Sequence, residues 1–295
     1  MTTPMGTAEI GDYWALLKPR VMSLVVFTGA VGVAVAPGQI HPFLALVAIL
    51  CIALSAGGSG AINMWYDRDI DAIMQRTARR PIPAGRVAPH EAAEIGSMLI
   101  MGSVGLMGLA TNWLAAGLLA FAAGFYVFIY TMWLKRRTPQ NIVIGGAAGA
   151  FPPMIGWVAV TGDVSLGAVL LFLLIFFWTP PHFWALALYR NDDYSRAGVP
   201  MLPVVAGARA TKLQMLIYTL VLFPVALAPA WFGYAGWMYG VGAAAFGVGF
   251  IVHAVRVWFD VTDGAARRMF RFSLVYLAGL FALLLIDHVC GMPTW

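Results

Sequence analysis

The chain has 295 residues, of which 61% are hydrophobic and 11% charged, and its mean hydropathy is +0.82. A soluble globular domain cannot keep this much apolar surface away from water, so the composition excludes that class and indicates a polytopic membrane protein. The formal net charge of +5 indicates membrane topology before nucleic-acid binding, and we expect no nucleic-acid partner because no aromatic-basic motif is present.

Nine apolar stretches are long enough to cross a bilayer as helices, with short connections between them. They cover residues 21–37, 43–62, 93–111, 114–134, 141–160, 165–188, 213–232, 237–258 and 272–290. The fold class predicted is therefore all-α, a polytopic transmembrane helical bundle, with residues 1–295 forming one integral-membrane domain. Residues 1–17 lack the basic region and apolar core of a signal peptide, so we expect them to remain as a cytoplasmic N-terminal segment.

All 18 Lys and Arg residues fall on one side of the predicted membrane. They are Lys18, Arg20, Arg68, Arg76, Arg79, Arg80, Arg86, Lys135, Arg136, Arg137, Arg190, Arg196, Arg209, Lys212, Arg256, Arg267, Arg268 and Arg271. The positive-inside rule makes this side cytoplasmic, which places the N-terminus inside and the C-terminus outside. The orientation of the protein in the membrane is enough to explain many of these basic residues.

The connection after the second stretch holds a polar stripe. Because a helix turns about 100° per residue, Asn63, Asp67 and Asp71 share one face, whereas Asp69 points elsewhere. Two carboxylates and an amide on one face offer an all-oxygen ligand set for a hard cation such as Mg²⁺, which commonly bridges protein to phosphate. Solvated acids at a helix end are the alternative, which the shared face argues against.

A run of bases follows this stripe directly, at Arg76, Arg79, Arg80 and Arg86. Arginine binds phosphate through two parallel hydrogen bonds. Acids for a divalent metal beside arginines for phosphate are what a metal-diphosphate site requires.

Basic residues also fill the connection at 134–141, where Lys135 and Arg136 are either a positive-inside anchor or phosphate contacts. Gly145, Gly146 and Gly149 follow and would let neighbouring helices approach closely. The cysteines, Cys51 and Cys290, are interpreted as small apolar packing residues.

The connection after the sixth stretch repeats the pattern of the first, with acids at a helix end, then arginine, then a Gly- and Pro-rich passage. Tyr189 and Asp193 are four residues apart and would share a helix face if the helix continues that far. Arg196 follows. The two connections suggest a degenerate internal duplication around a shared cavity.

His182 lies within the sixth stretch, after Pro180 and Pro181, where an ionisable residue is costly enough to suggest a role. It would either contact a ligand within the membrane or bond a carbonyl that the prolines leave free. His253 is a weaker candidate.

Several long motifs carry a resemblance to a known family. They are Asn63–Asp71, Arg79–Pro83, Leu134–Asn141, Trp178–Trp184 and Ala197–Pro203. Together they resemble the protoheme IX farnesyltransferase family of the UbiA intramembrane prenyltransferase superfamily, over about residues 15–290. This resemblance implies a UbiA-like fold of nine spans. It also implies farnesyl transfer from farnesyl diphosphate to a vinyl group of heme b with water addition, giving heme O and diphosphate.

The resemblance also implies roles for residues of this chain. Asn63, Asp67, Asp71, Tyr189 and Asp193 would form the catalytic centre, with Asn63, Asp67, Asp71 and Asp193 as Mg²⁺ ligands. The diphosphate would be bound by Arg76, Arg79, Arg80, Lys135, Arg136 and Arg196, and heme by His182. Tyr189 is a departure, because many relatives of the superfamily have two aspartates in the second motif.

The aromatic residues near these motifs would shield an allylic cation, or else form an interfacial belt. They are Trp65, Tyr66, Phe177, Trp178, Phe183, Trp184 and Tyr189. The expected environment is the bilayer of a bacterial inner membrane, with a downstream heme A synthase or terminal oxidase assembly as partners.

Two rival classes and one rival substrate are weighed against this interpretation. A secondary transporter would place its polar groups near the midplane, and a heme-binding scaffold would need paired axial ligands. Neither explains the stripe beside the arginines. Prenylation of an aromatic quinone precursor remains the alternative within the enzyme class.

Overall fold

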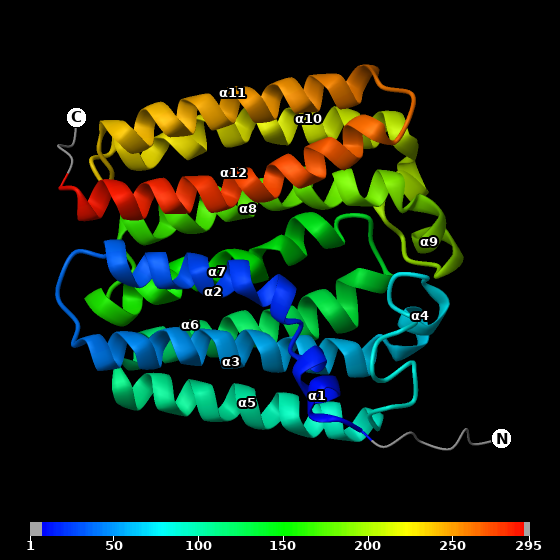
Figure 1. Cartoon of the computed structure of the whole chain (residues 1–295), viewed down its shortest axis with the longest axis horizontal. Coiled ribbons are helices and arrows are strands. Elements are labelled where there is room, and N and C mark those ends of the chain that lie inside the picture. The colour runs from blue at the N-terminus through cyan, green and yellow to red at the C-terminus, as the bar shows by residue number, and fades with distance from the viewer. Residues whose placement is uncertain (1–7, 292–295) are drawn as a thin grey trace.

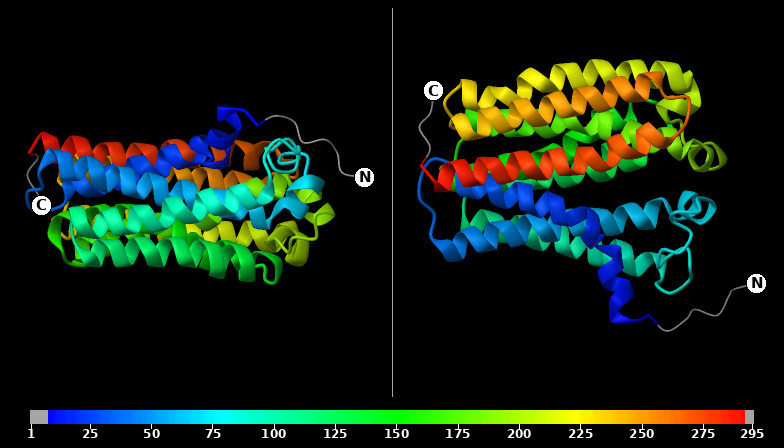
Figure 2. Two further views of the ribbon diagram at one scale, coloured as in Figure 1. Left: turned by 90° about the horizontal axis from the view of Figure 1, so that it is seen from below. Right: turned by 45° about the horizontal axis from the view of Figure 1, so that its top comes forward.

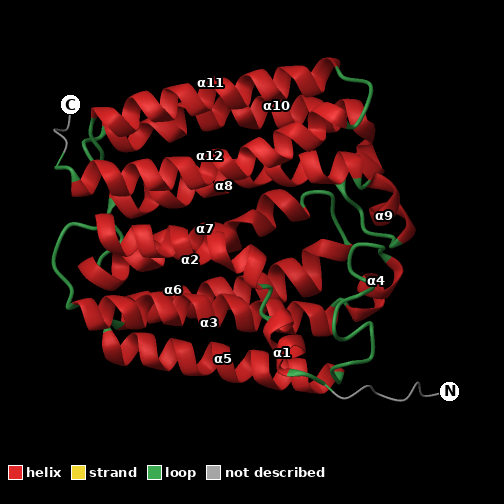
Figure 3. Cartoon of the chain, in the orientation of Figure 1, coloured by secondary structure: helices red, strands yellow, loops and turns green. Residues whose placement is uncertain are grey.

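The computed structural model describes residues 8–291, and within this range every regular element is helical (Figures 1 and 3). The elements are α1 (Ile10–Leu16), α2 (Pro19–Val35), α3 (Pro42–Tyr66), α4 (Arg68–Ile73), α5 (Pro89–Ala110), α6 (Trp113–Gly124), a π-helix (Phe125–Trp133), a 3₁₀ turn (Leu134–Arg136), α7 (Asn141–Thr161), α8 (Leu166–Tyr189), α9 (Asn191–Arg196), α10 (Leu202–Trp231), α11 (Trp237–Phe259) and α12 (Gly264–Val289). Parts of the predicted terminal segments, residues 1–7 and 292–295, lie outside the described range.

Eight helices of the described chain are long and apolar enough to cross a membrane. The ninth span is the pair α1 and α2, which passes the same test together with a bend of 54°. The prediction of a helical bundle with nine spans is confirmed with this pair counted as one. The fourth span runs unbroken from α6 through the π-helix to Arg136.

Two helices begin well before the apolar stretches that predicted them. The seventh stretch was placed at 213, but α10 begins at Leu202 and is interrupted at Gly207, whose φ is 79°. The ninth was placed at 272, but α12 begins at Gly264. Hydropathy marks only the apolar part of a helix, and here each helix continues through basic residues beyond it.

The long helices lie side by side along one axis, and α4 and α9 are neighbours at one end of the bundle (Figure 1). The two turned views keep these short helices together at that end (Figure 2). We call this the polar end, formed by α4, α9 and the connection 134–141. The chain therefore brings its polar connections together, as the sequence predicted.

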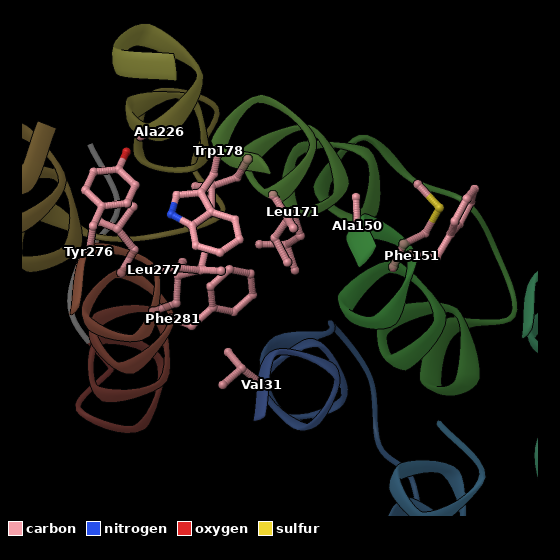
Figure 4. Packing of buried hydrophobic residues seen from close by; sticks show 14 of the residues in the cluster. Val31, Ala150, Phe151, Leu171, Trp178, Ala226, Tyr276, Leu277 and Phe281 are labelled. Atoms are coloured by element: carbon pink, nitrogen blue, oxygen red, sulfur yellow. The ribbon is translucent and has the colours of Figure 1, made fainter. Parts of the chain in front are cut away.

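Apolar packing and close backbone contacts hold neighbouring helices of the bundle together. Figure 4 shows Trp178 of α8 close to Leu277 and Phe281 of α12. The helices α2 and α7 touch through their backbones, because a Cβ atom at Gly32 would overlap the carbonyl oxygen of Pro153. This contact is the close approach that small residues allow in membrane bundles.

The expected close approach at the start of α7 occurs at two of three glycines. A Cβ atom at Gly145 would overlap the ring of Tyr130, and one at Gly146 would crowd Thr179. At Gly149 it would meet no atom within 4 Å, so the prediction is wrong there. Both cysteines were predicted to be packing residues. Cys51 is buried, which confirms the prediction, but Cys290 is exposed, so the prediction is wrong for that residue.

Candidate active site

The predicted stripe of Asn63, Asp67 and Asp71 forms at the end of α3. The helix changes direction at Asp67, but backbone hydrogen bonds continue from Asp67 N to Asn63 O at 2.9 Å and from Asp71 N to Asp67 O at 2.8 Å. All three side chains are buried, whereas 61% of the Asp69 side chain is exposed. The spacing of four residues therefore survives the break between α3 and α4.

Each buried carboxylate of the stripe is paired with a cation. Arg80 donates from Nη1 to Asp71 Oδ2 at 2.6 Å, and Lys135 donates to Asp67 Oδ2. Arg136 lies 3.5 Å from Asp67 Oδ1. A buried carboxylate that lacks such a partner is strongly destabilising, so these cations stabilise the fold of the site.

Asn63 connects the stripe to two other helices. Its Oδ1 accepts from Lys18 Nζ at 2.6 Å, and its Nδ2 donates to Asp67 at 2.8 Å and to Thr131 Oγ1 at 3.1 Å. Lys18 was interpreted only as an orientation residue and was missed as part of the site. A lysine directly before Pro19 at the start of the first span was the signal available.

The corner between α1 and α2 places Lys18 in this position. Lys18 has φ 52° and ψ 54°, a left-handed conformation that costs energy for any residue with a Cβ atom. Gly60 lies beneath it, since a Cβ atom there would be 3.4 Å from Lys18 Cδ. The corner thus packs directly on α3, and the 54° bend directs the lysine toward the stripe.

The π-helix of the fourth span supplies the opposite wall. Its wider turns hold Thr131 and lead into the 3₁₀ turn that carries Lys135 and Arg136. Tyr66 fastens this wall to α3 by donating to the carbonyl oxygen of Met132 at 3.3 Å. Single π-turns are frequent at functional sites because they redirect side chains.

Asp69 has a different role from its neighbours. It accepts two hydrogen bonds of 2.7 Å from Arg136, at the exposed edge of the site. These bonds are the main reason that the pKa of Asp69 falls to about 2. Asp69 therefore positions Arg136 from outside the stripe.

The other arginines of the run are less engaged. Within residues 8–291 the side chains of Arg76 and Arg79 form no hydrogen bond or ion pair. Arg86 is bound to Asp12 of α1 at 2.7 Å, which anchors the loop. Of the predicted diphosphate ligands, only Arg80, Lys135 and Arg136 thus contact the stripe.

The second acidic connection does not form the predicted face. Helix α8 ends at Tyr189, and Asp193 N bonds to Arg190 O, so the helix does not continue from Tyr189 to Asp193. Asp193 is buried and accepts from Arg196 at 2.5 Å. The prediction of a shared face is wrong because the chain restarts as α9 after Arg190.

Short apolar contacts hold α4 and α9 against one another. Ile70 and Met74 pack with Tyr194, Val199 and Met201 in one buried cluster. This cluster places the two acidic connections side by side at the polar end, as Figure 1 shows.

The donor atoms fit a hard cation at the stripe but do not form a closed metal cage. No three His, Cys, Asp or Glu side chains of residues 8–291 come together as a metal site. Asp193 therefore does not join Asp67 and Asp71 in one group, as the predicted ligand set required. The buried oxygens of Asn63, Asp67 and Asp71 still match the ligands that Mg²⁺ prefers, with open positions left for phosphate.

His182 lies deeper, on α8, between two aromatic rings. It stacks on Trp178 at 4.3 Å and on Phe270 at 4.6 Å, and its Nδ1 lies 2.6 Å from Ser273 Oγ. The alternative that His182 bonds a carbonyl freed by the prolines is wrong, because Ser273 is its partner. Nε2 makes no hydrogen bond in the described chain and remains available to a ligand.

The predicted aromatic residues do not act as one group. Trp178 and Trp184 are buried in the core, and Trp184 packs on Tyr218. Tyr66 lies beneath Arg136, whose guanidinium is 4.9 Å from the ring centroid. An interfacial belt therefore does not describe the two tryptophans, and Tyr66 borders the charged site.

The site thus combines buried carboxylate and amide oxygens, basic side chains paired with them, and an apolar interior. Residues 25–278 match the UbiA prenyltransferase family. The chain is 59% identical to a protoheme IX farnesyltransferase of Parvibaculum lavamentivorans over 98% of this chain and 91% of that protein. Proteins of the same name from Acidiphilium cryptum and Rhizobium etli are 60% and 57% identical over at least 96% of this chain and 92% of theirs.

Solved structures share the fold. A digeranylgeranylglyceryl phosphate synthase superposes with a TM-score of 0.80 at 17% identity, covering 95% of this chain and 99% of that one. A UbiA homolog from Archaeoglobus fulgidus bound to GPP and Mg²⁺ has a TM-score of 0.64 at 17% identity, covering 92% and 99%.

Proposed function

The chain belongs to the UbiA prenyltransferase family, and from that premise we propose that it transfers the farnesyl group of farnesyl diphosphate to a vinyl group of heme b. Water adds in the same reaction, and the products are heme O and diphosphate. This assignment of substrate rests on the 57–60% identity, over at least 96% of the chain, to proteins named protoheme IX farnesyltransferase. The charged site and the buried histidine provide the two chemical environments that such a reaction needs.

The diphosphate belongs at the polar end. Mg²⁺ bound by Asn63, Asp67 and Asp71 would neutralise charge on the diphosphate and so make it a better leaving group. The relatives of the fold solved with prenyl diphosphate and Mg²⁺ support this expectation.

The ion pairs of the structure explain how this chain's residues would receive a charged substrate. Arg80 and Lys135 now neutralise Asp71 and Asp67. With a divalent cation held at these carboxylates, Arg80 and Lys135 would be free to donate to diphosphate oxygens. They would then stabilise the negative charge that develops as the carbon–oxygen bond breaks.

Three further arginines of the predicted set would complete the binding of the diphosphate. Arg76 and Arg79 are uncommitted within the described chain, and Arg196 would reach from α9 while Asp193 holds it. Asp193 would orient Arg196 in this scheme, with a metal ligated through the α3 stripe. Tyr189 would serve the heme side.

The apolar interior would protect the allylic cation from water before it meets the vinyl carbon. His182 would contact heme there through Nε2, since Ser273 occupies Nδ1. Histidine is a common axial ligand of heme iron, and a hydrogen bond to Nδ1 sets the tautomer that presents Nε2.

The proposed setting is a bacterial inner membrane, with the polar end and the N-terminus cytoplasmic and the C-terminus periplasmic. The one-sided distribution of Lys and Arg supports this orientation. Heme O would pass to a downstream heme A synthase or to terminal oxidase assembly.

The test is a reconstitution. Purified protein in detergent or liposomes receives heme b, farnesyl diphosphate and Mg²⁺, and the heme product is identified by mass. We expect a gain of one farnesyl group and one hydroxyl group, because the water that adds to the vinyl group loses a proton. Parallel reactions with an aromatic quinone precursor test the other acceptor, and prenylation of that precursor alone would overturn the assignment.

A further inference from the structure

An aromatic row crosses from α8 to α12 and back. Trp178 stacks on His182 at 4.3 Å, His182 stacks on Phe270 at 4.6 Å, and Phe270 meets Tyr189 edge to face at 6.0 Å. The two helices lie side by side in both views (Figures 1 and 2). The row therefore runs from the buried histidine to the end of α8, at the polar end.

Two arginines stand at the outer end of this row. The guanidinium of Arg267 lies 5.1 Å from the centroid of the Tyr189 ring, and that of Arg190 lies 5.9 Å from it. Both side chains are exposed. They come from different helices, α12 and the end of α8, and meet over one ring.

These arginines are not neutralised in the way that the stripe cations are. Arg267 forms no side-chain hydrogen bond or ion pair with any residue in 8–291. Arg190 lies 4.0 Å from Asp193, which is held at 2.5 Å by Arg196. Arg267 has no carboxylate partner within residues 8–291, and Arg190 shares Asp193 with Arg196, so these two positive groups over one ring favour an anion between them.

We propose that Arg267 and Arg190 bind the propionate carboxylates of the heme acceptor and so fix which edge of the porphyrin enters the membrane. This inference rests on the proposed function, because it assumes heme b as acceptor. Arginine suits the task, since its planar fork matches a carboxylate.

The spacing agrees with the size of heme. Tyr189 is seven residues after His182 on α8, a rise of about 10 Å along the helix. This distance is comparable to the distance from the iron at the porphyrin centre to the propionate carboxylates at the porphyrin rim. A heme whose iron faces His182 would thus present its propionates to the arginines over Tyr189.

The orientation has a consequence for the reaction. The propionates occupy one edge of protoheme IX, so holding that edge at the polar end directs the vinyl-bearing part of the ring inward. Phe270, which lies between His182 and Tyr189, would pack against the porphyrin. The vinyl group would then meet the farnesyl chain away from bulk water.

The experiment compares heme b with its dimethyl ester, in which both propionates are neutral. Each is titrated by Soret absorbance into the wild type and into Arg267→Gln, Arg190→Gln and Arg268→Gln. Arg268 is the matched control, because it neighbours Arg267 on α12 but reaches back toward Gly264. A non-hydrolysable farnesyl diphosphate analogue is titrated into the same proteins in the presence of Mg²⁺.

We expect Arg267→Gln to weaken heme b binding about tenfold and Arg190→Gln to weaken it severalfold, as for the loss of a charge-assisted hydrogen bond. The diester should bind both variants as it binds the wild type, because the lost contact requires a carboxylate. Arg268→Gln should bind heme b normally, and the diphosphate analogue should bind all variants normally.

The proposal is overturned if Arg267→Gln binds heme b as tightly as Arg268→Gln does. It is also overturned if the full preference for heme b over the diester persists in Arg267→Gln, as it would if the arginines served an anionic lipid headgroup. A wild type that binds heme but makes no heme O would refute the proposed function instead, while the ester comparison would still decide the role of Arg267.

Discussion

Arg80 donates from Nη1 to Oδ2 of Asp71 at 2.6 Å, so a base expected at the diphosphate is bonded to an acid expected at the metal. The pair joins α4, in which Asp71 is buried, to the turn after it, where Arg80 is partly exposed. Binding of a metal to Asp71 and of a diphosphate to Arg80 would therefore both require this ion pair to open. The two ligands should consequently assist each other.

The first prediction concerns the carboxylates of the stripe. Asp67→Asn and Asp71→Asn should each reduce heme O formation by at least about a hundredfold, since each removes a charge proposed to hold Mg²⁺. Asp69→Asn should retain most activity, because Asp69 lies off the stripe and its side chain is bonded to Arg136 at the exposed edge of the site. Turnover is measured for all three, with circular dichroism and thermal midpoints as controls of folding.

An equal loss in all three variants, with normal folding, would show that the stripe geometry does not select the ligands. The ionisation of Asp69 does not complicate the comparison. Its pKa is lowered to about 2 by the hydrogen bonds from Arg136, so the group stays charged above that pH. Protonation of Asp69 would weaken its contact with Arg136 only as the pH falls toward 2.

The second prediction concerns the exchange of partners at Arg80. Arg80→Gln leaves Asp71 buried without its cation, which should lower the thermal midpoint in the absence of metal. Added Mg²⁺ should restore more of the midpoint in this variant than in the wild type. Binding of a farnesyl diphosphate analogue with Mg²⁺ should fall about tenfold, by calorimetry. Arg86→Gln is the control, since Arg86 is bonded to Asp12. If both variants behave alike, the loop and not the ion pair is responsible.

The third prediction concerns the left-handed residue at the corner of α1 and α2. Lys18→Gly and Lys18→Ala both remove the hydrogen bond to Asn63, so both should lose turnover to the same degree. Lys18→Gly should be more stable than Lys18→Ala by about 1 kcal/mol, because glycine adopts φ 52° without a Cβ clash. The free energies of unfolding of the two variants, measured in the same detergent, give this difference. A more stable alanine variant would indicate that the corner relaxes.

The sequence was sufficient for the number of spans and for the stripe, because both depend on local regularities. Apolar length identifies a span, and a spacing of four residues identifies a helical face even where Asp67 bends the chain. The role of Lys18 could not be predicted in this way. Its contact with Asn63 depends on a left-handed residue and a 54° bend, neither of which leaves a periodic pattern.

The second acidic connection is another case in which local sequence spacing did not predict the structure. The spacing of Tyr189 and Asp193 is helical, but α8 ends between them and α9 begins anew. Where a helix ends is decided by packing, here the buried cluster that joins α9 to α4. Sequence spacing alone therefore assigned Tyr189 to the acidic site, whereas the structure places it under Arg267, beside Phe270.

The fourth prediction concerns orientation in the membrane. A reporter inserted at Gly85 or Gly198 should be cytoplasmic, and one fused after Trp295 should be periplasmic, because all Lys and Arg lie on one side. Alkaline phosphatase and fluorescent-protein fusions give opposite signals in the two compartments. Moving the reporter from the C-terminus to the connection at 233–236 should leave it periplasmic. A cytoplasmic signal from the C-terminal fusion, with Gly198 cytoplasmic, would mean that α10, α11 and α12 do not all cross the membrane.

The last prediction separates the two roles around His182. His182→Ala should weaken heme binding and alter the Soret band, because it removes the Nε2 that faces a ligand and one ring of the stack. Ser273→Ala should have a smaller effect on affinity, since the ring remains but loses the partner that fixes its tautomer. Binding of the farnesyl diphosphate analogue with Mg²⁺ should be normal in both, because these residues lie apart from the charged stripe. Heme absorbance titrations and analogue binding are measured on the same preparations. If His182→Ala leaves heme affinity, Soret band and turnover unchanged, the histidine serves only to link α8 to α12 through Ser273.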